Sequence, residues 1–62
     1  MDAPSADLRS LLDRLKQAQH ALLDEAARQP GLPSTAMIRK IAELENMIAA
    51  VIALIEERQS SR

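Results

Sequence analysis

The 62-residue sequence contains no cysteine and no phenylalanine, tyrosine or tryptophan. Without cysteine, a disulfide bond and a thiolate zinc site are both excluded, and the single histidine, His20, cannot anchor a metal site alone. The hydrophobic core has to be built from Leu, Ile, Val, Met and Ala. A domain of about 60 residues buries only about 60% of the surface that its unfolded chain exposes. Since such small folds usually need a disulfide, a metal or a partner, we expect this chain to be stabilised by association.

Neither sign of charge is in large excess, because eight Lys and Arg residues stand against nine Asp and Glu residues. Both signs are spread along the chain, whereas nucleic-acid-binding proteins usually concentrate positive charge to contact phosphates. Binding to nucleic acid is therefore disfavoured.

Long apolar runs are also missing. The longest, 47–55, would extend about 14 Å as a helix, which is too short for a hydrocarbon core of about 30 Å. The first ten residues, MDAPSADLRS, have neither the basic n-region nor the apolar h-region of a secretory signal. We therefore expect a cytoplasmic protein that does not interact with membranes.

Proline and glycine are concentrated near the middle of the chain, in the segment QPGLPS. Pro30 disfavours helical geometry at Gln29, and Gly31 can adopt the left-handed conformation that commonly ends a helix. Ser34 can then cap a second helix by accepting a hydrogen bond from a backbone N–H near Met37. This pattern predicts two helices joined by a short turn, and a turn this short makes the helices antiparallel neighbours.

The predicted fold is one all-α domain over 1–62, an antiparallel two-helix hairpin that completes a helical bundle with a partner or a second copy. The expected elements are a first helix over about 5–28, a turn over 29–33, a second helix over about 34–59, and frayed ends at 1–4 and 60–62. Ser5 is the expected cap of the first helix, and Asp7 lies in its expected first turn, where the helix dipole favours an anion.

Apolar residues recur at steps of three and four along both predicted helices, which is the spacing of one helix face. In the first helix they are Leu8, Leu11, Leu12, Leu15, Ala18, Leu22 and Ala26. In the second helix they are Met37, Ile41, Leu44, Ile48, Val51 and Ile55. The second set has the spacing of a coiled-coil seam.

The second helix carries more apolar surface than one neighbouring helix can cover, because no polar residue occurs between Met47 and Ile55. A helix that is apolar on all sides is normally buried on all sides, and an uncovered apolar patch often marks an interface. We therefore predict a protein interface on the second half of this helix. Its residues are Leu44, Met47, Ile48, Val51, Ile52, Leu54 and Ile55.

No group of side chains in the sequence indicates catalysis. His20 lies on the polar face of the first helix, and two helices leave no room for a pocket around it, so we interpret it as solvated. We expect Asn46 to be exposed, although an Asn buried in an interface can set the register of a coiled coil. No phosphate-binding loop, metal-ligand spacing or nucleophile motif is present. We therefore expect no enzymatic activity, no cofactor, and no catalytic or metal-binding residue.

The apolar second helix, with Leu44-Glu45 followed by Ile48, Val51, Ile52 and Leu54, resembles the bacterial co-chaperones of type III secretion needle subunits, the YscE, PscE and AscE type. The leucine pattern of the first helix and Asp24-Glu25 before the turn are also similar. The resemblance runs from about Leu8 to Glu57. It implies a helical-repeat chaperone as partner, with which the chain holds a needle subunit monomeric in the cytoplasm.

Other interpretations remain open. Two hairpins could form a four-helix-bundle homodimer, as in the plasmid copy-control protein Rop, and act as a regulator. The chain could also be an antiactivator that sequesters a transcription factor, or the needle subunit itself. The sequence does not identify the partner or decide between homodimer and heterodimer, because the same apolar face serves both.

Overall fold

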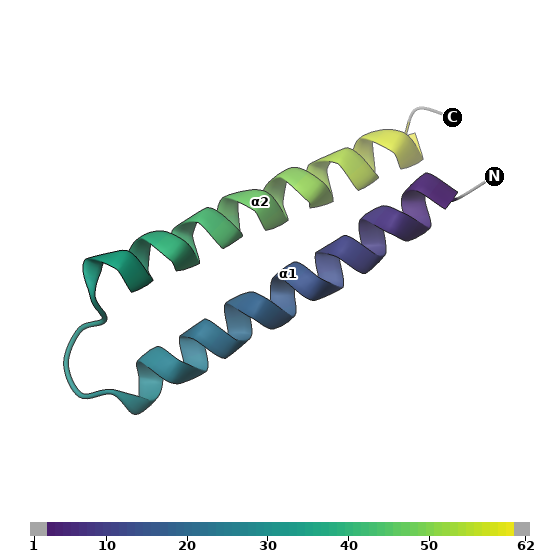
Figure 1. Ribbon diagram of the computed structural model, residues 1–62. Coiled ribbons are helices and arrows are strands. Elements are labelled where there is room, and N and C mark those ends of the chain that lie inside the picture. The colour runs from purple at the N-terminus through teal and green to yellow at the C-terminus, as the bar shows by residue number, and fades with distance from the viewer. Residues whose placement is uncertain (1–2, 61–62) are drawn as a thin grey trace.

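The computed structural model describes residues 3–60 as two α-helices of 26 residues each, α1 (Ala3–Arg28) and α2 (Thr35–Ser60). The helices lie side by side and antiparallel, with the start of α1 and the end of α2 at one end of the molecule and the turn at the other (Figure 1). The Cα atoms span 48 × 14 × 13 Å. The predicted all-α hairpin is confirmed, whereas assembly into a larger bundle stays a prediction.

Helix α1 begins earlier than the sequence pattern predicts. It starts at Ala3 and includes Pro4, because proline lacks only an N–H that a first helical turn leaves unpaired in any case. Ser5 therefore lies inside the helix and is not its cap, and Asp7 falls beyond the first turn, which holds no acidic residue. At the end of α2, Ser60 is helical as well. Of the ends expected to fray, 3–4 and 60 are thus helical, and 1–2 and 61–62 lie outside the described residues.

The turn has the local chemistry that the sequence predicts. After α1 ends at Arg28, Gln29 N donates to Ala26 O at 3.2 Å, and Gly31 adopts a left-handed φ of 78°. Ser34 caps α2, since its Oγ accepts a hydrogen bond from Met37 N at 3.1 Å. These interactions stop one helix and start the next within six residues, 29–34, and so make the helices antiparallel.

Burial follows one seam along each helix. In α2 the seam residues are those predicted, Met37, Ile41, Leu44, Ile48, Val51 and Ile55. In α1 the half-buried residues with the same alternation of four and three steps are Leu8, Leu12, Leu15, Gln19, Leu22 and Ala26. Ala18, which the sequence pattern placed on this stripe, is exposed. The reason is helical geometry: four residues after Leu15 the seam passes through Gln19, and Ala18 lies about 100° away.

Gln19 also fixes how the helices are aligned. Its Nε2 donates to Glu45 Oε1 at 2.6 Å, and this hydrogen bond joins the two helices. In an antiparallel pair this bond sets the level of every other position, and it brings Leu12 and Leu15 to the level of Val51 and Ile48. The buried core therefore lies between the middle of the hairpin and its open end.

Candidate protein-interaction surface

The seven predicted interface residues do not form one surface. Ile48, Val51 and Ile55 are only 6%, 5% and 6% exposed, and they are the buried core of the hairpin. Their place in the middle of the seam explains this, because α1 covers them directly. In the hairpin as it stands, these three side chains offer a partner almost no surface, which narrows the predicted interface to the other four residues.

The other four residues lie on two opposite flanks of α2. At about 100° per residue, Ile52 is on the same side of the seam as Glu45, whereas Met47 and Leu54 are on the opposite side, with Leu44 at its margin. Leu44, Ile52 and Leu54 are half-buried, and Met47 is 46% exposed. Ile52 therefore lies on the other side of α2 from Leu44, Met47 and Leu54, and one partner surface cannot contact all four at once.

Each flank of α2 continues onto α1, so that the hairpin has two broad faces. The hydrogen bond between Gln19 and Glu45 marks one of them, the Gln19 face. The Gln19 face is formed by Leu12, Lys16, Gln19, Leu23, Ile38, Glu45 and Ile52. The opposite one, the Met47 face, is formed by Leu11, Ala18, Leu44, Met47 and Leu54.

The two faces differ in what occupies their middle. The middle of the Gln19 face is polar, since Lys16, Gln19 and Glu45 lie there. Its exposed large apolar residues, Leu23 at 45% and Ile38 at 50%, lie nearer the turn. The middle of the Met47 face is formed by apolar residues, with the charged Arg14 and Glu43 at its outer edges, which makes it the better candidate for a protein interface.

Sequence reasoning missed the contribution of α1 to this surface. Leu11 and Ala18 fit the apolar stripe of the first helix and were therefore expected to face the second helix. In the structure Leu11 is half-buried and Ala18 is exposed, both on the Met47 side of the seam. The signal that identifies them is the alternating seam spacing in α1, which leaves these two residues to one side.

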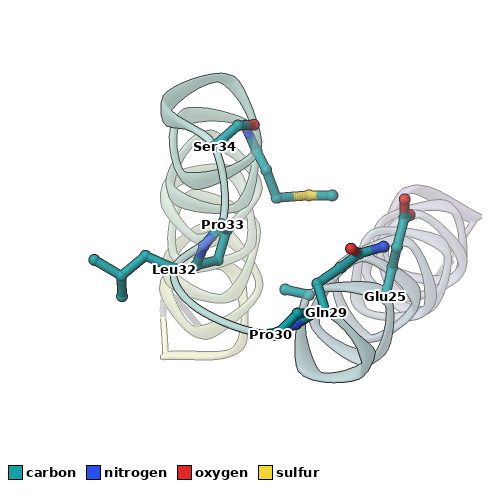
Figure 2. Close-up of a pocket in the computed structure, with 8 residues that line it drawn as sticks. Glu25, Gln29, Pro30, Leu32, Pro33 and Ser34 are labelled. Atoms are coloured by element: carbon teal, nitrogen blue, oxygen red, sulfur yellow. The ribbon is translucent and has the colours of Figure 1, made fainter.

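A shallow depression of about 260 Å³ lies at the turn, between the end of α1 and the start of α2. Glu25 reaches it from α1, and Gln29 and Ser34 reach it from the two ends of the connecting segment (Figure 2). Leu32 also borders it, but its side chain points away from Gln29, and this residue is 91% exposed. Because the Ser34 hydroxyl caps α2, the side chains here serve the turn and offer no pair of groups for proton transfer or nucleophilic attack.

The polar side chains considered for a specific role in the sequence face solvent. His20 and Asn46 are both exposed. Across the described residues 3–60, no group of three or more His, Cys, Asp or Glu side chains is arranged to hold a metal ion. Within the same part of the chain, neither helix is long and apolar enough to cross a membrane.

The fold and its surface define a class of protein, the short antiparallel helical hairpin with an apolar side face. Comparison with known proteins adds no narrower assignment, since no family model, curated protein or solved structure matches the chain.

Proposed function

We propose that this chain is a non-catalytic protein-binding module that completes its hydrophobic core against helices of another protein chain. The observation that carries the proposal is how little the hairpin buries. Among residues 6–60 only Ile48, Val51 and Ile55 are buried, while Ile38 and Met47 are about half exposed, at 50% and 46%. A pair of helices covers one stripe on each, and a further layer is needed to cover the flanks.

The more specific form of this function is that of a small chaperone subunit in type III secretion. The resemblance of α2 to needle co-chaperones supports this form, as does a surface suited to other helices. Holding a needle subunit monomeric requires that the surface through which it polymerises be covered, and an apolar helical face of the size found here can cover such a surface. In this role the chain acts together with a helical-repeat chaperone in the cytoplasm.

Co-expression tests the chaperone form directly. A tagged copy of the chain is produced with the helical-repeat chaperone and the needle subunit encoded in the same genome, and the complex is analysed by size-exclusion chromatography with light scattering. We expect one complex of fixed stoichiometry in which the needle subunit stays monomeric. If the needle subunit polymerises equally with and without the chain, the chaperone form is wrong.

A matched pair of variants tests the surface in the same experiment. Met47→Glu places a charge on the Met47 face, and we expect it to weaken the complex at least about tenfold, because an apolar contact tolerates an unpaired charge poorly. Asn46→Glu adds the same charge to an exposed position next to it, and the complex should persist. Equal effects of the two variants would contradict a role for the Met47 face in partner binding.

A further inference from the structure

The hairpin exposes more surface than a compact protein of its size. Its solvent-accessible surface is 4840 Å² at a mass of 6.8 kDa, whereas a compact monomer of this mass exposes about 4,000 Å². The excess is roughly 800 Å², which matches the surface that each partner contributes to a stable interface. A single docking event of ordinary size would therefore bring the chain to a normal degree of burial.

We propose that a second copy of this chain docks on the Met47 face, with the two turns at the same end of the dimer. In this arrangement α1 of each hairpin packs on α2 of the other, and the two-fold axis runs along the hairpins. The inference goes beyond the proposed function, because the occupant is an identical chain and not a different protein.

Side-chain size favours this arrangement over the head-to-tail alternative. On the Met47 face α2 presents the large residues Met47 and Leu54, whereas α1 presents Ala18 with Leu11 as its one large residue. When α1 packs on α2 of the second copy, Met47 meets the small position at Ala18, and Leu54 lies near the level of Leu11. In a head-to-tail dimer centred on Met47, α2 would pack on α2, so that Met47 meets Met47 and Ala18 lies near Ala18 of the second copy.

Charge favours the same arrangement. Glu25 of α1 and Lys40 of α2 line one depression of about 270 Å³ near the turn, on the Met47 side of the seam. With both turns at the same end, Glu25 of each copy faces Lys40 of the other. A head-to-tail dimer centred on Met47 would instead bring Lys40 opposite the apolar Leu54 of the second copy, so this pairing of opposite charges would be lost.

Sedimentation equilibrium of the full chain tests the dimer, with interference detection because the chain has no Trp or Tyr. We expect a reversible monomer–dimer equilibrium. Met47→Glu should weaken it at least about tenfold, because the dimer would bury the charge. Ile38→Glu is the matched control: it lies on the same helix and is similarly exposed, 50% against 46%, but on the Gln19 face. It should leave the dimer constant unchanged.

Three results would overturn the docking site: a wild-type chain that stays monomeric, a dimer that survives Met47→Glu, or a dimer that Ile38→Glu abolishes. Helicity is checked by far-UV circular dichroism, and if Met47→Glu unfolds the chain, Met47→Gln takes its place with the same expected direction. A monomeric wild-type chain that still binds a different protein would overturn this inference and leave the proposed function standing.

A distance measurement tests the orientation. The chain has no cysteine, so Leu32→Cys gives one labelling site at the exposed tip of the turn. Two spin labels in a dimer with both turns at one end should be separated by much less than the 48 Å length of the hairpin. A separation near that length would mean a head-to-tail dimer and would overturn the proposed arrangement.

Discussion

At the scale of single residues, Gln19 differs most from its surroundings. It occupies a seam position between Leu15 and Leu22, where an apolar residue would bury more surface. A polar residue at such a position in a coiled coil commonly fixes the register at some cost in stability. The hydrogen bond from Gln19 to Glu45 is the interaction through which it does so here.

Replacing this glutamine should make the hairpin more stable. In Gln19→Leu the gain from burying a leucine exceeds the loss of one exposed hydrogen bond, and we expect a net gain of about 1 kcal/mol. Thermal unfolding followed by circular dichroism should show a midpoint raised by roughly 4–8 °C. Gln17→Leu, at an exposed position of the same helix, should change stability by less than about 0.5 kcal/mol. A lower midpoint for Gln19→Leu would show that the bond to Glu45 outweighs the apolar contact.

Gly31 matters through its backbone alone. Its φ is 78°, and a Cβ atom built on it would meet nothing within 4 Å. Gly31→Ala should therefore destabilise the hairpin by about 1 kcal/mol through backbone strain, without any steric clash. Gly31→Asn should cost less, because Asn tolerates the left-handed region better than Ala. Urea unfolding of the three proteins measures both differences, and an Ala variant as stable as the wild type would mean that the turn relaxes to a negative φ.

At the scale of the elements, the second helix is predictable because its start carries a specific signal. Ser34 follows Pro33 directly, and its hydroxyl can accept a hydrogen bond from the backbone N–H of Met37, three residues later. The cap could therefore be predicted from the sequence. The start of α1 carries an ambiguous signal instead. Pro4 is compatible both with a position just before a helix and with a position in its first turn. The structure shows that Pro4 lies in the first turn of α1.

The cap of α2 should carry a measurable part of the stability. Ser34→Ala removes the acceptor for Met37 N, and we expect a loss of about 1 kcal/mol. Thr35→Ala is the control, because this substitution removes a hydroxyl from the exposed neighbouring residue and leaves the cap in place. Urea unfolding at one fixed protein concentration compares the two variants. Equal losses would show that water replaces the Ser34 hydroxyl as partner of the backbone N–H.

The candidate surface was harder to predict than the fold, because the hydrophobicity of a residue does not show whether α1 or a partner buries it. The run from Met47 to Ile55 reads as uniformly apolar, yet Ile48 and Val51 are covered by α1 while Met47 stays half exposed. The missing information is the direction of the seam across this run. It depends on the register that Gln19 and Glu45 set, and no pattern within α2 alone contains it.

At the scale of the whole molecule, the hairpin is long and thin. Its radius of gyration is 14.5 Å, whereas a compact domain of 62 residues has about 11 Å. Such a shape gives each helix only one neighbour, so most side chains keep contact with water. Folding and association are therefore expected to be coupled, because the surface that association removes from water is large compared with the core of the isolated hairpin.

This coupling predicts that thermal stability depends on protein concentration. If a second copy docks on the Met47 face, a hundredfold rise in concentration stabilises the dimer by about 2.7 kcal/mol, and the unfolding midpoint followed by circular dichroism should rise accordingly. For Met47→Glu the midpoint should be lower and independent of concentration, whereas Ile38→Glu should keep the dependence of the wild type. A wild-type midpoint that stays constant over the same range would mean that the hairpin folds as a stable monomer. Its unfolding would then require no second chain, and the exposed flank of α2 would contribute nothing to stability in isolation.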